Sequence, residues 1–310
     1  MRIMFMGTPE IAATCLKKLI DDGKEIVAVV TREDKPRGRG NVMTPTPVKA
    51  LAMEHGIPAY TPKTLRDGEF SSLLSEVSPD LIAVVAYGKI LPKEVIDFPK
   101  HGCVNAHVSL LPKYRGAAPM QRAIMEGERE TGVTIMYMDE GLDTGDIICA
   151  ESFPISDTDD FESIHDRSAE VGARLLSETV DAIDENRATR TKQDSSLATY
   201  AAKVEKEDAK IDFSLDAKKL DFIIRGVTPI PGAFAYLNGK MLKIRRASPI
   251  SATGAPGEVI NVSASGEGSI TVACGEGALL ITSVIPEGKG KMSAGDFVRG
   301  RKINVGDILV

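Results

Sequence analysis

Clustered cysteines are absent from this sequence of 310 residues. The four cysteines are scattered, with no Cys-x-x-Cys pair and no Cys/His cluster. This distribution argues against a zinc site and against a framework of disulfide bonds. No apolar run approaches the roughly 18 residues of a transmembrane helix, and the apolar N-terminus is too short for a secretory signal. We therefore expect a cytoplasmic protein without a membrane partner.

A strong positive charge is also lacking, because the net charge of the chain is −6. The charge is unevenly distributed, since residues 208–310 carry 13 Lys/Arg and 10 Asp/Glu. A mildly basic C-terminal third is compatible with an ordinary solvated surface and does not by itself indicate a nucleic-acid partner. Hydrophobic residues make up 43% of the chain, which is enough to bury a sizeable core.

The glycine-rich fingerprint of dinucleotide-binding proteins is missing as well. A short apolar strand at residues 2–6, a helix with a 3.6-residue period and a buried strand at residues 25–31 predict a βαβ unit. Such a beginning favours an α/β fold with a doubly wound, Rossmann-like, mainly parallel sheet. The first turn has a single glycine, Gly7, so we do not expect it to bind a dinucleotide.

The pattern of residue types changes after a charged segment that contains few apolar residues. Short β-rich runs then recur about every ten residues, and Asn238-Gly239 between two of them is a strong hairpin signal. We predict a catalytic domain over residues 1–188, a linker over 189–207 and a small OB-like β-barrel over 208–310. Residues 31–46 are polar and are expected to form a solvated surface loop, with a basic loop that grips phosphates as the alternative.

Two polar stretches follow neighbouring predicted strands. Asn105 and His107 are two residues apart on a strand at residues 102–108, so their side chains share one face. Asp143 lies in a second polar loop, residues 139–146, which follows the next strand. In open α/β sheets, ligands bind at the edge formed by the carboxyl ends of the strands, where both stretches lie. We expect the two loops to meet and form a reaction centre.

These residue types suit acyl transfer without a covalent intermediate. The Asn105 amide can donate an N–H to a developing oxyanion, where one such donor contributes about 3 kcal/mol. His107 can shuttle protons near neutral pH, and Asp143 could orient or charge-stabilise its ring. A covalent route through Cys103 and metal-assisted hydrolysis are less favoured, because nothing visible activates the thiol and the two loops hold only one histidine. An Asn-x-His pair can also occur on any strand without catalytic meaning.

The flanking motifs resemble the folate-dependent formyltransferase family. They are His107-Val-Ser-Leu-Leu-Pro112, then Tyr114-Arg115-Gly116 and Gly141-Leu-Asp143-Thr-Gly145. Within that family the likeness to members that formylate methionine on initiator tRNA covers nearly the whole chain. It includes residues 6–10, 34–40, 45–49, 200–208 and 224–233.

The resemblance implies a co-substrate, an acceptor and a set of site residues. The formyl donor would be 10-formyltetrahydrofolate, with no metal, and the acceptor the α-amine of initiator methionyl-tRNA, bound through its acceptor stem for translation initiation. Asn105, His107 and Asp143 would be catalytic. The folate pocket would be lined by Ser109, Leu110, Leu111, Pro112, Tyr87, Gly88 and Leu142. The tRNA would contact Arg37, Arg39, Lys203 and Lys206, and the protein would act as a monomer.

One departure and two rival interpretations stand beside this resemblance. The chain has no tryptophan, and Phe213 and Ile230 occupy positions where many family members have an aromatic residue. A formyltransferase that acts on a small amine, such as a sugar nucleotide or glycinamide ribonucleotide, would share the catalytic residues but should lack the Arg-Gly-Arg loop and a basic barrel. A non-catalytic RNA-binding protein would leave Asn105, His107 and Asp143 unused.

Overall fold

The computed structural model describes residues 1–37 and 41–310, which form two compact units. Unit 1 comprises residues 1–116, 130–154 and 165–201, and unit 2 comprises residues 117–129, 155–164 and 202–310. Arg39, expected to contact tRNA, lies outside the described residues. The predicted domain boundaries at residues 188 and 207 stay a prediction.

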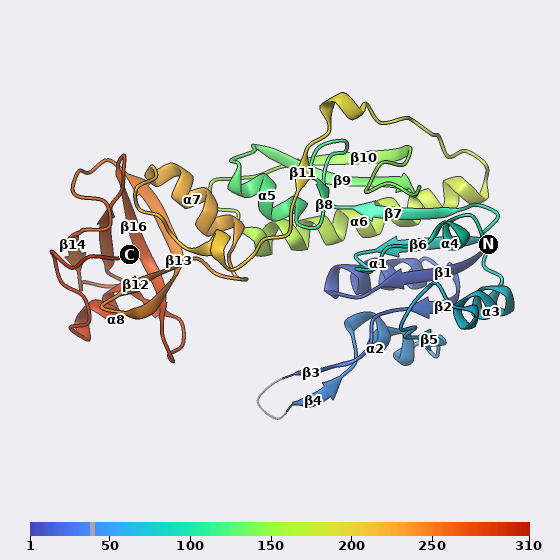
Figure 1. The fold of residues 1–310 in the computed structure, drawn as a ribbon, viewed down its shortest axis with the longest axis horizontal. Coiled ribbons are helices and arrows are strands. Elements are labelled where there is room, and N and C mark those ends of the chain that lie inside the picture. The colour runs from blue at the N-terminus through green and yellow to red at the C-terminus, as the bar shows by residue number, and fades with distance from the viewer. Residues whose placement is uncertain (38–40) are drawn as a thin grey trace. The chain divides into compact units, whose positions relative to one another are not determined.

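Unit 1 is organised around a seven-stranded sheet with the order β10-β9-β7-β6-β1-β2-β5 (Figure 1). The strands from β7 to β5 are parallel, whereas β9 runs antiparallel to β7 and β10 antiparallel to β9. The predicted Rossmann-like, mainly parallel sheet is thereby confirmed. The strands are β1 (Arg2–Gly7), β2 (Glu25–Val30), β5 (Ala59–Tyr60), β6 (Leu81–Val85), β7 (Cys103–His107), β9 (Glu130–Tyr137) and β10 (Ile147–Pro154).

The central strands β1, β6 and β9 are buried on both faces, which explains their continuous apolar runs. Met4 and Met6 of β1 pack with Phe70 and Leu74 of a helix on one face, while Ile3 and Phe5 are buried on the opposite face. The connecting helices are α1 (Glu10–Asp21), α2 (Pro47–Glu54), α3 (Gly68–Val77), α4 (Lys93–Ile96) and the long α6 (Phe161–Asp184), whose first four residues belong to unit 2.

Two short pairings in unit 1 were not predicted from the sequence. Strands β3 (Lys35–Arg37) and β4 (Val42–Thr44) form an antiparallel hairpin. The surface exposure expected for this segment is present at Val42 and Met43, but the pairing of its strands was not predicted. The hairpin extends away from the sheet (Figure 1), and its exposed strands show no apolar alternation that would reveal them. Strand β8 (Arg115–Gly116) pairs in parallel with β11 (Tyr200–Ala201), which is preceded by the 3₁₀ turn Ser195–Leu197.

Unit 2 is built on an antiparallel sheet with the order β12-β13-β16-β15-β14, and β17 pairs with β16. Asn238 and Gly239 both have positive φ, as a two-residue hairpin turn requires, so the predicted hairpin is confirmed. The strands are β12 (Phe234–Leu237), β13 (Lys240–Ile250), β14 (Val259–Ser263), β15 (Ser269–Ala273), β16 (Ala278–Pro286) and β17 (Met292–Ser293). The helices are α5 (Pro119–Met125), α7 (Ala217–Gly226) and α8 (Ala294–Arg299), with a 3₁₀ turn at Glu207–Ala209.

The last residues of the chain pair with both edges of this sheet. Tyr236 and Val310 exchange two backbone hydrogen bonds of 2.6 and 3.0 Å. On the other side, Leu309 N donates to Gly257 O and Val259 N donates to Asp307 O, each at 2.8 Å. The terminal segment thus lies between the β12 and β14 edges and leaves neither fully open, in the manner of a small barrel.

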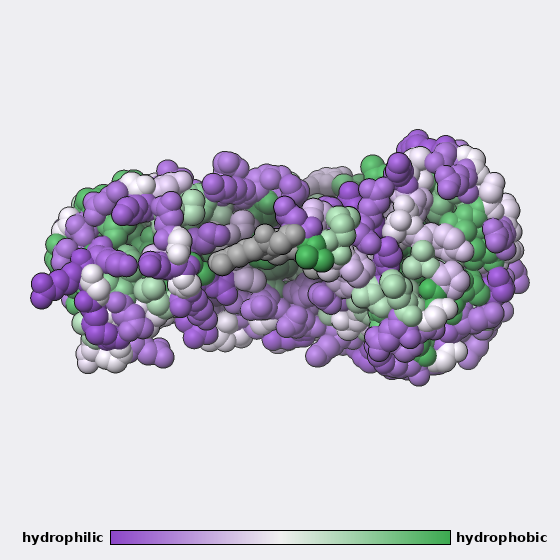
Figure 2. Space-filling model, turned by 90° about the horizontal axis from the view of Figure 1, so that it is seen from below, coloured by the Kyte–Doolittle hydropathy of each residue, from purple (hydrophilic) through white to green (hydrophobic). Residues whose placement is uncertain are grey.

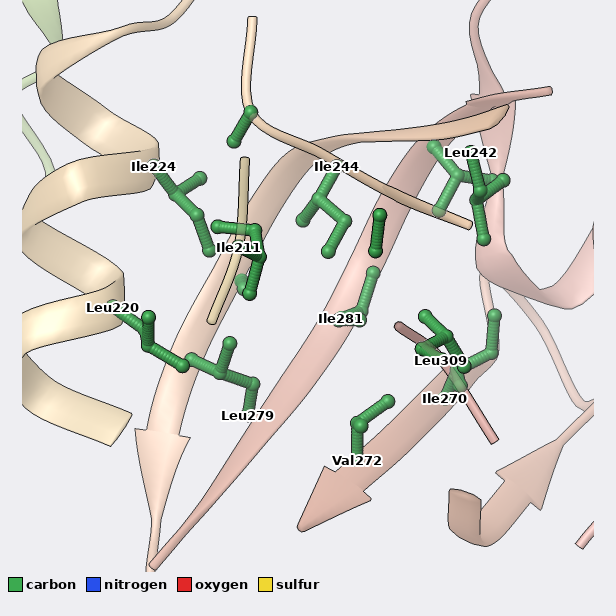
Figure 3. Packing of buried hydrophobic residues seen from close by; sticks show 14 of the residues in the cluster. Ile211, Leu220, Ile224, Leu242, Ile244, Ile270, Val272, Leu279, Ile281 and Leu309 are labelled. Carbon is green, nitrogen blue, oxygen red and sulfur yellow. The ribbon is translucent and has the colours of Figure 1, made fainter. Parts of the chain in front are cut away.

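The core of unit 2 lies between the sheet and α7. In Figure 3, Leu220 and Ile224 of α7 point toward Leu279 and the neighbouring strands. Leu309 of the terminal segment belongs to the same buried cluster and is 2% exposed. Outside the cores, the face shown in Figure 2 is largely hydrophilic, with apolar residues in small patches. Within the described ranges, no helix has the length and apolar character needed to cross a bilayer.

Candidate active site

Strand β7 presents Asn105 and His107 on one face at its carboxyl end. Asn105 lies between Val84 of β6 and Met136 of β9, and His107 lies opposite Thr134. His107 is buried and Asn105 is half-buried. No residue of the described ranges forms a hydrogen bond with the side-chain amide of Asn105. Its N–H groups are therefore available to an incoming carbonyl oxygen.

The His107 ring lies between two oxygen acceptors. Its Nε2 is 3.0 Å from the backbone oxygen of Tyr114, and because a carbonyl only accepts, Nε2 donates in this contact. Its Nδ1 is 3.6 Å from Oδ1 of Asp143, which is too long for a direct hydrogen bond but suits an ion pair with a protonated ring. Asp143 thus lies where it stabilises a positive imidazole.

The loop that carries Asp143 is held in a tight turn. Asp143 has a φ of 53°, and its Oδ2 accepts the N–H of Gly116 at 2.8 Å. A Cβ on Gly145 would come within 1.8 Å of the Tyr137 backbone oxygen, so only glycine fits there. The structure therefore brings together the loop after β7 and the loop after β9, as the sequence led us to expect.

The expected folate-pocket residues of the loop after β7 mostly form hydrogen bonds or packing contacts with other residues of the protein. Ser109 is fully buried, and its Oγ donates to Lys113 O at 2.7 Å. Thr134 Oγ1 donates to Ser109 O at 2.7 Å and accepts from Leu111 N at 3.2 Å. The Leu110 side chain packs over Gly132 of β9, Leu111 is buried, and Pro112 is half-buried. This set fixes the shape of the loop beside His107.

The remaining expected folate contacts lie at the ends of other strands. Tyr87 is buried in the core, and burial raises the pKa of its phenol to about 12. Its backbone oxygen accepts from Thr8 Oγ1 at 3.1 Å, so this residue offers a ligand only its main chain. Gly88 has a φ of 79°, and its oxygen accepts from Arg32 at 3.2 Å. Leu142 is 59% exposed.

The described residues expected to contact tRNA lie in β3 and in unit 2. The backbone of Arg37 belongs to β3. In unit 2, Lys203 is exposed and pairs with Glu205 at 2.9 Å. Lys206 Nζ lies 5.6 Å from the centre of the Phe234 ring, a cation–π distance.

Cys103 is poorly suited to covalent catalysis. It is 1% exposed, its Sγ lies 3.6 Å from the backbone oxygens of Val95 and Ile96, and burial raises the pKa of the thiol to about 12. Since the thiolate is the nucleophile, this environment leaves the sulfur unreactive. Across residues 1–37 and 41–310, no group of three or more His, Cys, Asp or Glu side chains is arranged to hold a metal.

Three residues that support the site were not predicted to belong to it. Gln193 donates to the backbone of the Asp143 loop, Arg115 holds Gln193, and Thr199 accepts from Tyr114 N at 2.9 Å. Gln193 and Thr199 come from a charged segment expected to be linker, and no local pattern distinguishes them. Arg115 belongs to the quoted motif, but burial of its guanidinium is visible only in the structure.

Comparison with known proteins agrees with this geometry. A family model described as formyl transferase matches residues 1–180, and one described as formyl transferase, C-terminal domain, matches residues 203–302. Fold and site thus define a formyl transferase. The methionyl-tRNA formyltransferases of Citrifermentans bemidjiense and Geotalea uraniireducens are each 48% identical over 100% of this chain and over 96% and 98% of their own lengths. The chain belongs to the methionyl-tRNA formyltransferase family.

Solved structures with lower identity share the fold. HypX from Aquifex aeolicus in complex with tetrahydrofolic acid has a TM-score of 0.66 and 21% identity, covering 96% of this chain and 47% of that protein. An N-formyltransferase from Helicobacter canadensis, in complex with folinic acid and dTDP-3-aminofucose, has a TM-score of 0.66 and 19% identity, covering 90% of this chain and 98% of that one. At these identities the likeness concerns the fold alone.

Proposed function

We propose that this protein transfers the formyl group of 10-formyltetrahydrofolate to the α-amine of initiator methionyl-tRNA, giving N-formylmethionyl-tRNA for translation initiation. The observation that carries the proposal is the unengaged amide of Asn105 on the same strand face as the His107–Asp143 pair. The full-length relatives at 48% identity, named methionyl-tRNA formyltransferases, support this acceptor.

A folate-type donor is supported by proteins of the same fold. HypX is solved with tetrahydrofolic acid, and the Helicobacter canadensis enzyme with folinic acid. In this chain Ala86 and Gly88 are exposed and follow β6, the strand beside β7, and residues 109–112 follow β7 itself. Asn105 supplies the free donor that a formyl oxygen needs. When bound, the donor supplies a formyl carbon attached to a nitrogen that can leave.

The chemistry follows from the three side chains. The methionyl amine attacks the formyl carbon, and Asn105 donates to the oxygen as it becomes an oxyanion, an interaction typically worth about 3 kcal/mol. The amine loses a proton as the new C–N bond forms. The bond from the formyl carbon to the folate nitrogen then breaks, and that nitrogen takes up a proton. His107, with Asp143 balancing its charge, assists this proton movement.

We infer that basic residues of two further segments recognise the tRNA. We assign acceptor-stem contacts to Arg37, Arg39, Lys203 and Lys206, whose charges can bind phosphates. Residues 208–310, with 13 Lys/Arg, would act as the tRNA-binding barrel behind a linker at residues 189–207 and a catalytic domain at residues 1–188. The reaction places the protein in the cytoplasm, where translation begins, and we expect it to act as a monomer.

The decisive experiment offers one donor and three acceptors. Purified protein with 10-formyltetrahydrofolate is given initiator methionyl-tRNA, elongator methionyl-tRNA or an amino sugar nucleotide, and formyl transfer is followed by mass spectrometry. We expect transfer to initiator methionyl-tRNA alone. Transfer to the amino sugar nucleotide and not to tRNA would replace the proposal with the small-amine alternative, and no transfer to any acceptor would overturn both.

A further inference from the structure

Gln193 makes two hydrogen bonds to the turn that carries Asp143. Its Nε2 donates to the backbone oxygen of Asp143 and to that of Gly145, each at 2.8 Å. One side-chain amide group thus spans both ends of a three-residue turn. It fixes the main chain from which the Asp143 carboxylate projects toward His107.

The orientation of the Gln193 amide is itself determined by a buried charge. Arg115 is 2% exposed, and its Nε and Nη2 donate to Gln193 Oε1 at 3.1 and 2.7 Å. An amide rotated by half a turn would place its NH₂ group against the guanidinium and its oxygen against two carbonyls. Arg115 therefore allows only the orientation that binds the turn.

The turn needs such support, because Asp143 has a φ of 53°. This left-handed conformation is unfavourable for a residue with a Cβ and persists where surrounding contacts impose it. The Asp143 carboxylate contributes one contact, by accepting the N–H of Gly116 at 2.8 Å. Gln193 contributes two further contacts, the hydrogen bonds from its Nε2 to the main chain of this turn.

The same segment also fixes the second partner of His107. Thr199 Oγ1 accepts from Tyr114 N at 2.9 Å, and Thr199 O accepts from Arg115 N at 2.9 Å. Tyr114 O is the oxygen that faces His107 Nε2. Residues 193–199 therefore hold the groups on both sides of the imidazole ring.

We propose that Gln193, oriented by Arg115, is a positioning residue for formyl transfer that holds Asp143 against His107. The inference rests on the proposed function, since it assigns Gln193 a role in that reaction. It makes the segment between the two predicted domains part of the catalytic machinery. Gln193 touches no reacting atom and acts through Asp143.

The test replaces the donor group and keeps the rest of the side chain. In Gln193→Glu the acceptor for Arg115 remains, while an oxygen faces the carbonyls of Asp143 and Gly145. We expect the single-turnover formyl-transfer rate at saturating donor and tRNA to fall at least about tenfold, with KM for both within about threefold. Gln121→Glu is the matched control, because Gln121 Nε2 donates to a backbone oxygen, that of Ile230, in unit 2. Its rate should stay within about twofold of the wild-type rate.

A double-mutant cycle separates positioning from general damage. If Gln193 acts through Asp143, then Gln193→Glu should cost less than about threefold when added to Asp143→Asn. Multiplication of the two single effects would overturn the proposal. Should Gln193→Glu fail to fold, Gln193→Asn serves in its place, because its shorter amide cannot span Arg115 and both carbonyls.

The outcomes distinguish this inference from the function on which it rests. A wild-type protein that transfers no formyl group to any acceptor overturns the proposed function. Wild-type activity in Asp143→Asn overturns the role given to Asp143 and this inference with it. If wild type and Asp143→Asn behave as expected but Gln193→Glu keeps the wild-type rate, only the positioning role is wrong.

Discussion

The carboxylate of Asp143 lies 3.6 Å from Nδ1 of His107, although 36 positions separate them in the sequence. One residue ends strand β7 and the other follows β9, two antiparallel neighbours in the sheet. Because His107 Nε2 already faces Tyr114 O, the Asp143 side of the ring is where added positive charge is compensated. The side-chain amide of Asn105 is left as the uncharged donor of this strand face, which we propose binds the formyl oxygen.

Removal of that donor should slow the chemical step more than binding. Asn105→Ala is expected to lower kcat about 10²–10³-fold, as removal of a single oxyanion donor does elsewhere, with little change in KM for tRNA. Asn261→Ala is the control, because Asn261 is an exposed asparagine of β14 in unit 2. Steady-state kinetics with initiator methionyl-tRNA measure both variants. A larger effect on KM than on kcat would mean that Asn105 contributes to ground-state binding.

The buried thiol at the start of β7 should be dispensable. The pKa of Cys103 is raised to about 12 by burial, so almost no thiolate is present at neutral pH. Cys103→Ala is expected to keep kcat within about threefold of wild type, because the residue has only a packing role. Half-buried Cys149 should react first with an aromatic disulfide reagent in the folded protein. Loss of all transfer in a folded Cys103→Ala protein would revive the covalent route.

The loop around Asp143 should not tolerate a side chain at Gly145. A Cβ there would lie 1.8 Å from Tyr137 O, so Gly145→Ala must displace the loop and with it Asp143. We expect a loss of about 1–3 kcal/mol in the free energy of unfolding, typical of overpacking, together with reduced kcat. Gly68→Ala is the control, since nothing lies within 4 Å of its Cβ and it begins helix α3. Urea unfolding and kinetics on both variants give the comparison.

The sequence revealed the parts of this site that share one strand or one motif. Asn105 and His107 follow from the period of two on β7, and the sheet follows from its apolar runs. Gln193 and Thr199 could not be predicted, because their hydrogen bonds join segments about 50 and 85 positions apart and depend on tertiary structure. The β3–β4 hairpin was missed for a different reason, since Val42 and Met43 are both exposed and show no alternation.

The sequence also did not show which side chains point into the core. Tyr87 follows a buried strand and was expected to line the folate pocket, yet its phenol lies in the core and its hydroxyl has no hydrogen-bond partner among the described residues. The residue before it, Ala86, has a φ of 45°, and this turn decides the direction of the side chain. A positive φ at an alanine cannot be predicted from the residue types around it.

Basic residues of the Arg-Gly-Arg segment should govern use of tRNA. Arg39→Ala is expected to raise KM for initiator methionyl-tRNA by about tenfold, the cost of one charged contact, while affinity for the folate donor stays unchanged. Arg66→Ala is the control, because it removes the same charge at an exposed arginine of unit 1. Kinetics at several salt concentrations and folate titration separate the two substrates. An equal fall in folate affinity would show that the assignment of Arg39 to tRNA is wrong.

The stability of unit 2 should depend on its terminal segment. Leu309 is 2% exposed in the core, and the backbone at residues 307–310 pairs with both edges of the sheet. Leu309→Ala is expected to lower the free energy of unfolding by about 2–4 kcal/mol, because the cavity adds to the lost burial. Val310→Ala is the control one position away, since Val310 is 61% exposed and should change stability by less than about 0.5 kcal/mol. Equal effects of the two substitutions, measured by urea unfolding, would show that Leu309 does not anchor the segment.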